Sequence, residues 1–152
     1  MANCGGRAEI SFSTDIRVYF QDTDAGNVVY HGAYLNFFER ARTEWLRHLG
    51  FEQPQLIERF GVMFIVRSME LKFLRPARLD DLVEVSVEVS RMGRAQVTLA
   101  QEVAIKGAVL VRALVNLACV STESFQPQPL PGEIGTAFSS ISGTSTIKRK
   151  AT

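Results

Sequence analysis

The most regular feature of the chain is a stripe of apolar residues between positions 32 and 49. The stripe consists of Tyr34, Phe38, Ala41, Trp45 and Leu49, and Leu35, Phe37 and Leu46 widen it. Spacings of three and four residues place side chains on one face of a helix. Arg47, His48 and Gly50 then form a typical helix end. The pattern predicts one long and largely buried helix.

Most of the remaining chain has the period of two residues that is typical of β-strands. The clearest case is residues 83–89, in which valine alternates with glutamate and serine. Tight turns at Met92-Gly93 and Lys106-Gly107 separate neighbouring strands. Strands are predicted over residues 10–20, 67–75, 83–91, 94–105 and 108–120, and a short second helix over 53–60. This order predicts an α+β fold, in which the long helix covers the apolar face of an antiparallel sheet of about five strands.

The segment 108–120 is apolar except for Arg112 and Asn116, so we expect a central strand that is buried on both faces. Because one helix covers only one face, a second subunit is expected to share the outer face or the sheet edge. After Ser121 the chain is rich in Pro, Gly, Ser and Thr. We therefore predict one domain over residues 1–125 and a flexible C-terminal tail over residues 126–152.

Composition restricts the class of protein without identifying it. The 152 residues suit one domain with a real core, and the formal net charge of +1 gives no indication of a nucleic-acid partner. Cys4 and Cys119 lie far apart, so no disulfide is expected and a reducing compartment is favoured. The sequence has no secretory signal pattern, and its longest apolar run is too short to span a bilayer. We expect a cytoplasmic protein without stable membrane insertion.

The segment most suggestive of chemistry is residues 22–31 (DTDAGNVVYH), a polar loop that leads into the long helix. The unpaired N–H groups of a helix start carry roughly half a positive charge and can polarise an oxygen atom. A carboxylate from Asp22 or Asp24 beside such a terminus suits the hydrolysis of an activated acyl group. Aspartate is also a common turn and capping residue. The spacing alone leaves both interpretations open.

The same segment resembles the signature of a known family. Residues 22–31, with Tyr34 and residues 38–42 (FERAR), are similar to the motif of hot-dog fold acyl-CoA thioesterases of the 4-hydroxybenzoyl-CoA thioesterase type. The branch most like it is the one associated with the Tol-Pal system of Gram-negative envelopes. Residues 73–81 (FLRPARLDD) continue the resemblance, which covers roughly residues 10–125. It implies a hot-dog fold, with the sheet wrapped around the long helix, and an acyl-CoA substrate.

The resemblance assigns roles to particular residues. It implies that Asp24 is the catalytic carboxylate, acting as a general base on water or as a nucleophile that forms an anhydride. It implies that the backbone N–H of His31 binds the thioester carbonyl oxygen, and that no metal or redox cofactor is needed. Asn27 occupies a position where the family commonly has a second glycine, and asparagine tolerates positive φ well. We therefore expect the loop shape to survive this departure.

Substrate contacts and assembly are predicted on the same basis. Tyr30 is expected to line the substrate pocket. The turn with Arg91 and Arg94 aligns with one that contacts CoA phosphates in related enzymes, and Arg75 and Arg78 are second choices. A homo-oligomer is expected, either a dimer or a homotetramer built from dimers.

Three alternatives stay open at this point. Glu39 matches the mid-helix position from which another hot-dog branch takes its carboxylate, although Arg40 and Arg42 suggest a surface ion pair. A hydratase or dehydratase acting on acyl thioesters would pair an acid and a histidine at a shorter spacing than that of Asp24 and His31. A non-catalytic partner of an envelope or lipid-synthesis complex is the third. The acyl group itself is undetermined.

Overall fold

The computed structural model of the chain describes residues 12–139. Five antiparallel strands form one sheet in the order β1-β3-β4-β5-β2. The strands are β1 (Phe12–Arg17), β2 (Val62–Phe73), β3 (Leu82–Met92), β4 (Gln96–Ile105) and β5 (Ala108–Ser121). Strand β2 begins five residues earlier than the alternation predicted. The predicted α+β architecture of one long helix and a five-stranded sheet is confirmed.

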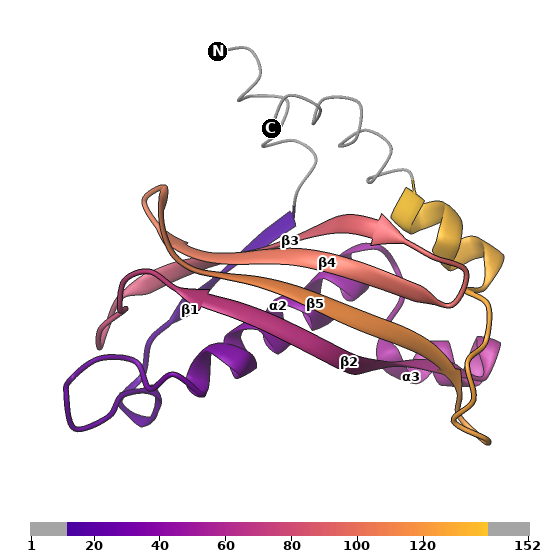
Figure 1. Cartoon of the computed structure of the whole chain (residues 1–152), viewed down its shortest axis with the longest axis horizontal. Coiled ribbons are helices and arrows are strands. Elements are labelled where there is room, and N and C mark those ends of the chain that lie inside the picture. Colours follow the sequence, from indigo (N-terminus) through magenta and orange to yellow (C-terminus); the bar gives the residue numbers. More distant parts are fainter. Residues whose placement is uncertain (1–11, 140–152) are drawn as a thin grey trace, which may run out of the picture.

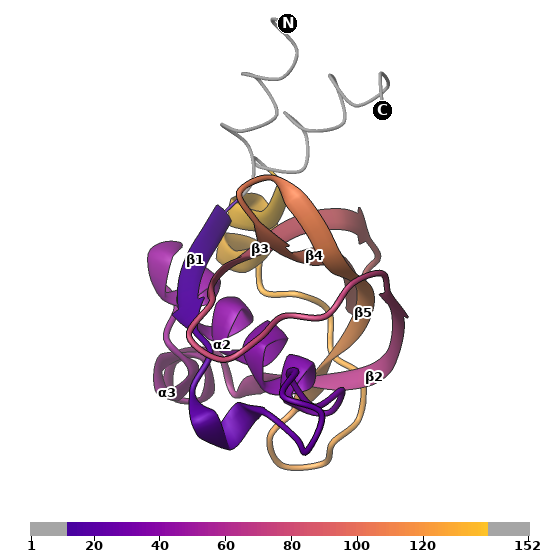
Figure 2. The same cartoon turned by 90° about the vertical axis from the view of Figure 1, so that its left-hand side faces the viewer.

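The long helix α2 (Ala33–His48) lies in the concave face of the sheet, which curls around it (Figures 1 and 2). Its apolar stripe is the centre of the core, where Phe37, Phe38 and Trp45 are fully buried. They face the inward side of β3, where the alternating valines are buried and the glutamates between them point outward. The two periods in the sequence therefore describe the two surfaces that pack together.

Strand β5 is central, between β4 and β2, but only its second half is buried on both faces. Arg112 and Leu114 are exposed on the outer face, whereas Ala118 and Val120 are buried. Residues 126–130 of the same chain run beside the end of this half, where Gln128 N–H donates to the Cys119 carbonyl at 2.9 Å. The predicted burial on both faces therefore holds only for this half of the strand, and the second subunit expected at the outer face or the sheet edge stays a prediction.

The chain after residue 131 forms a helix over residues 132–139, drawn in yellow in Figure 1. Ile134 and Phe138, one helical turn apart, are buried in the core. Phe138 stacks on Trp45 with ring centroids 4.8 Å apart. The sequence predicted a flexible tail from residue 126, and the structure instead has a packed helix over residues 132–139, because these two side chains bury apolar surface. Residues 140–152 of that predicted tail lie outside the described residues.

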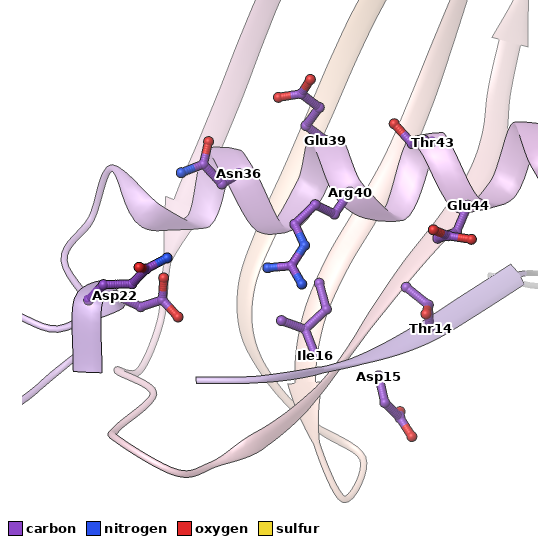
Figure 3. Close-up of a pocket in the computed structure, with 10 residues that line it drawn as sticks. Thr14, Asp15, Ile16, Asp22, Asn36, Glu39, Arg40, Thr43 and Glu44 are labelled. Carbon is purple, nitrogen blue, oxygen red and sulfur yellow. The ribbon is translucent and has the colours of Figure 1, made fainter. Parts of the chain in front are cut away.

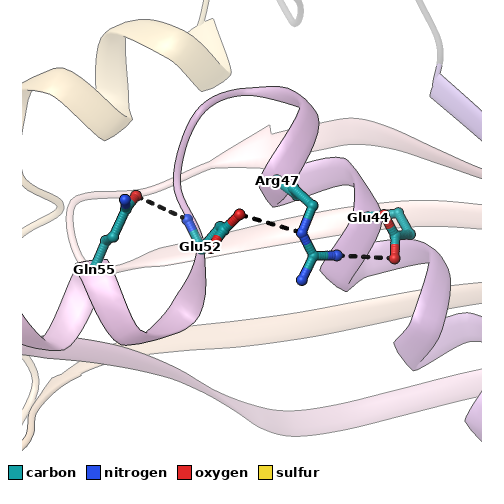
Figure 4. Close-up of polar contacts among 4 residues, drawn as sticks. All are labelled: Glu44, Arg47, Glu52 and Gln55. Atoms are coloured by element: carbon teal, nitrogen blue, oxygen red, sulfur yellow. Dashed lines mark hydrogen bonds and ion pairs between the residues drawn. The ribbon is translucent and has the colours of Figure 1, made fainter.

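A chain of polar contacts joins the end of α2 to the short helical segment predicted over 53–60. Arg47 forms ion pairs with Glu44 at 2.9 Å and Glu52 at 3.4 Å, and Glu52 N–H donates to the Gln55 side chain at 3.4 Å (Figure 4). The segment consists of α3 (Gln53–Gln55) and the π-helical turn η2 (Leu56–Phe60). It ends at Gly61, whose φ of 65° is the left-handed conformation that glycine adopts readily.

Candidate active site

The loop over residues 22–31 lies at one end of the sheet, before the start of α2 (Figure 1). It closes as a tight turn, in which Asp24 N–H donates to the Val28 carbonyl at 3.0 Å and Asn27 N–H to the Asp24 carbonyl at 2.9 Å. Asn27 has a φ of 63°. The left-handed conformation expected at this position is therefore present, and asparagine adopts it in place of glycine.

The Asp24 carboxylate is exposed and is held by the loop on one side only. Gly26 N–H donates to its Oδ1 at 2.8 Å. Within residues 12–139 no protein group hydrogen-bonds to Oδ2. A Cβ at position 26 would lie 3.3 Å from Oδ1, so glycine leaves this oxygen just enough room. One carboxylate oxygen is thus oriented by the backbone while the other is available to a ligand.

Asp22 has a different environment, although it is only two residues away. Its side chain accepts the Tyr19 N–H at 2.8 Å, and its carbonyl accepts the Tyr30 N–H at 2.8 Å. It belongs to the short 3-10 turn η1 (Phe20–Asp22). The turn-and-cap interpretation that the spacing left open therefore describes Asp22 well, since its carboxylate and its carbonyl both hold the loop in shape.

The start of α2 offers unpaired backbone donors. Ala33 N–H donates to the Tyr30 carbonyl at 2.8 Å, which makes residues 30–33 a turn that leads into the helix. Among the residues that the structure describes, no acceptor is paired with the backbone N–H of His31 or Gly32. The dipole of a helix with 16 residues adds to the positive potential at this point. A carbonyl oxygen can be bound and polarised here.

The Tyr30 side chain lies across this helix start. A Cβ on Gly32 would come within 2.6 Å of the Tyr30 ring, so the ring and the glycine backbone are in close contact. The rings of Tyr30 and His31 are 4.6 Å apart at their centroids, and both side chains are exposed. Tyr30 is therefore next to the two unpaired N–H groups, on the surface that a ligand bound there would touch.

A segment distant in sequence supports the loop from behind. Val29 N–H donates to the Ala77 carbonyl at 2.8 Å, and Val28 forms an antiparallel bridge with Arg78. Ala77 N–H in turn donates to the Tyr34 hydroxyl at 3.0 Å. The sequence pattern placed Tyr34 in the apolar stripe of the helix and indicated no partner for its hydroxyl. The resemblance of residues 73–81 to the family motif indicated that this segment is important, but not that it supports the loop over residues 22–31.

Arg91 and Arg94 do not lie near Asp24 in the same chain. Strand β3 begins beside the loop, where Val18 N–H donates to the Asp81 carbonyl at 2.9 Å, and then runs to the opposite end of the sheet (Figure 1). Its 11 residues span roughly 33 Å at about 3.3 Å per residue. Of the four arginines considered for phosphate binding, Arg75 and Arg78 are the ones at the Asp24 end.

Glu39 lines a different surface. It borders an open polar cleft of about 550 Å³ between β1 and the outer side of α2, which Asp22 and Arg40 also line. Arg40 points towards β1, whereas Glu39 points away from Asp22 (Figure 3). In the part of the chain that is described, Glu39 forms no ion pair with its arginine neighbours.

Arg42 turns inward from the same stretch of α2. Its Nη1 donates to the buried Gln101 side chain at 3.0 Å, and burial lowers the pKa of its guanidinium, an effect that the charge of Glu39 opposes. The surface ion pair suggested by the sequence is therefore replaced by a contact between Arg42 and the core.

Within residues 12–139, no group of three or more His, Cys, Asp or Glu side chains is arranged to hold a metal ion. No helix in this range is both long enough and apolar enough to cross a membrane.

Comparison with known proteins gives a consistent result. The model of the thioesterase superfamily matches residues 26–111. The acyl-CoA thioesterase YbgC of Haemophilus influenzae is 43% identical over 127 residues, covering 84% of this chain and 93% of that protein. The acyl-CoA thioester hydrolase YbgC of Escherichia coli is 42% identical over 128 residues, 84% of this chain and 95% of its own length. A crystal structure of a "Probable Thioesterase" from Bartonella henselae is 38% identical, with a TM-score of 0.75 over 80% of this chain and 99% of that one.

Proposed function

Because the chain belongs to the thioesterase superfamily, we propose that it hydrolyses an acyl-CoA thioester to a free acid and CoA with Asp24 as its catalytic carboxylate. The family and the hot-dog fold that residues 22–31 and 73–81 predicted are confirmed. Close relatives are acyl-CoA thioester hydrolases by name. The roles of individual residues are our proposal.

The proposal rests on two kinds of group at the ends of one short loop: a carboxylate oxygen and backbone N–H groups, each without a hydrogen-bond partner in the described residues. Within residues 12–139, Asp24 has one oriented and one available carboxylate oxygen, and the helix start seven residues later has unpaired N–H groups at His31 and Gly32. Hydrolysis of a thioester needs both the hydrogen-bond donors and the carboxylate. The N–H groups bind the carbonyl oxygen and stabilise the negative charge that develops on it, while the carboxylate serves the attacking group.

The reaction balances by either of two routes. Asp24 accepts a proton from water as the water attacks the carbonyl carbon; the carbon–sulfur bond then breaks and the thiolate of CoA takes up the proton. Alternatively, Asp24 attacks directly, CoA leaves as the thiolate, and water hydrolyses the mixed anhydride. The His31 side chain has no necessary part in either route, because the backbone N–H makes the contact.

The role of the N–H can be separated from that of the side chain. Residues 30–33 form a turn in which His31 is the second residue, the position that proline favours in common β-turns. His31→Pro removes the backbone donor and should lower kcat by about a hundredfold, the effect of losing one oxyanion donor. His31→Ala keeps the donor and should retain most of the activity. Equal losses in the two variants would contradict this assignment.

A second copy of the chain is part of the proposal. Strand β2 is an edge strand with exposed apolar residues, among them Ile65, Val66 and Phe73, and an edge of this kind favours pairing with another strand. Arg91 and Arg94 lie at the end of β3 away from the Asp24 loop, so in this proposal a second copy brings them to the site. Arg78 of the same chain is the alternative cation.

Truncated substrates can separate these cations from the acyl site. An acyl N-acetylcysteamine thioester has the scissile bond of acyl-CoA but no phosphates. If Arg94 binds phosphate, Arg94→Ala should raise KM for acyl-CoA and leave KM for the truncated thioester unchanged. If Arg78→Ala raises KM for acyl-CoA and Arg94→Ala does not, the phosphates are bound by the same chain that carries Asp24.

The reaction class is tested with the wild-type protein and a panel of aliphatic and aromatic acyl-CoAs. Equal amounts of free thiol and free acid should appear, and the panel should rank the acyl groups. Addition of water to an enoyl-CoA without thiol release would favour a hydratase. Binding of acyl-CoA with no turnover would favour the non-catalytic role.

A further inference from the structure

The hydroxyl group of Tyr34 is a closely constrained polar group near the proposed site. Tyr34 is in the first turn of α2 and is 3% exposed. Its ring packs edge-on against Phe37 and at a tilt against Phe73, each with centroids 5.8 Å apart. The ring therefore cannot turn without disturbing the core, and the position of its oxygen atom is fixed by packing.

This oxygen supports the active-site loop through one intermediate residue. It accepts the Ala77 N–H at 3.0 Å, and the Ala77 carbonyl accepts the Val29 N–H at 2.8 Å. Ala77 is completely buried, so water cannot replace either bond. Both polar groups of one peptide segment are thus used to connect the helix to the loop.

The loop position that is held in this way is central to the proposed chemistry. Val29 lies two residues before His31, and the carbonyl of its neighbour Val28 accepts the Asp24 N–H. A displacement of Val29 therefore moves the carboxylate and the helix-start donors relative to each other. Catalysis is sensitive to such movements, and a shift of about 1 Å can lower a rate by two orders of magnitude.

We infer that Tyr34 is a positioning residue for the thioesterase reaction, acting through Ala77 to hold Asp24 and the His31 N–H at their working separation. This inference rests on the proposed function. Tyr34 stays neutral in this role, which agrees with the effect of burial: desolvation raises the pKa of the phenol, the Asp81 charge raises it further, and the Ala77 bond opposes both. A neutral hydroxyl can accept the hydrogen bond from the Ala77 N–H without placing a charge in the core.

The test is Tyr34→Phe, which removes one oxygen atom and keeps the ring. We expect kcat to fall roughly ten- to a hundredfold on every acyl-CoA that the wild type hydrolyses, with little change in KM. Tyr19→Phe is the matched control, because Tyr19 is 62% exposed and the same atom is lost at a solvent-exposed position. A second control, Val89→Ala, truncates a buried side chain at the far end of β3 and should lower stability without lowering kcat.

Amide hydrogen exchange gives a readout that does not depend on turnover. Loss of the hydroxyl should speed exchange of the Val29 amide at least about tenfold, whereas Val89→Ala should not do so selectively. An active wild type with unchanged kcat in Tyr34→Phe, or unchanged exchange at Val29, would overturn the inference. An inactive wild type would contradict the proposed function alone, since the exchange measurement still decides whether Tyr34 holds the loop.

Discussion

Replacing Phe138 with alanine examines the part of the fold that the sequence pattern did not predict. Phe138 is 1% exposed and stacks on Trp45 with centroids 4.8 Å apart. Truncating a buried phenylalanine costs about 3–5 kcal/mol, from lost apolar burial and the cavity that remains. We expect a value near the lower end, because a helix at the end of a domain can relax more easily than a central strand.

The expected loss is large compared with the stability of a typical domain. A loss of about 3 kcal/mol is a substantial part of the 5–15 kcal/mol that a domain of this kind has in total. It corresponds to a fall in Tm of roughly 6–12 °C at about 2–4 °C per kcal/mol. The variant should still fold, but with a clearly lower midpoint in urea and on heating.

The assay has a built-in local probe, because Trp45 is the only tryptophan in the sequence. Urea unfolding followed by far-UV circular dichroism gives the free energy of unfolding, and tryptophan emission reports the Phe138 contact directly. Phe125→Ala is the matched control, since Phe125 is 61% exposed and an exposed site usually changes stability by about 0.5 kcal/mol or less. If Phe138→Ala matched this control, with emission like that of the wild type, the helix over 132–139 would not belong to the folded domain.

Two further predictions concern the loop and the residue that supports it. In Gly26→Ala the new Cβ would lie 3.3 Å from Asp24 Oδ1, so the carboxylate must move by a few tenths of an ångström and kcat should fall several-fold with Tm nearly unchanged; a normal kcat in steady-state assays would contradict the role of this oxygen. The pKa of Tyr34 is raised above its usual 10.0, so above about pH 10 the unfolded chain loses this proton before the folded one does, and the free energy of unfolding falls as pH rises. Urea unfolding at pH values from about 8 to 11 should show a smaller fall in Tyr34→Phe than in the wild type, and equal slopes would argue against a raised pKa.

Much of the architecture follows from local patterns. The helix was predicted over 32–49 and extends from Ala33 to His48, because its apolar stripe is also its packing surface. The turn at Lys106-Gly107 has φ values of 49° and 84°, the left-handed pair that tight antiparallel turns require. In these segments local preference and burial favour the same structure, so a short window of sequence is sufficient.

The differences arise where a structure depends on distant residues. The start of β2 has no alternation, because residues 62–66 are uniformly apolar, and the pairing with β5 is what makes them a strand. The helix over 132–139 depends on Trp45, and its glycine-rich and serine-rich surroundings suggested a tail. The same limit applies to the site. The loop itself could be predicted from its motif, but its support from Ala77 and its distance from Arg94 could not, because both are set by how the strands pair.

The most direct measurement of the central claim is the rate of thiol release from an acyl-CoA by the wild type, Asp24→Asn and Asp22→Asn. The two variants make the same chemical change two residues apart in one loop. We predict that Asp24→Asn lowers kcat by at least about a hundredfold with an unchanged fold, because it removes the positioned acid–base group. Asp22→Asn should lower it far less, since an amide oxygen can still accept the Tyr19 N–H. An Asp24→Asn variant that is as active as the wild type would contradict the account.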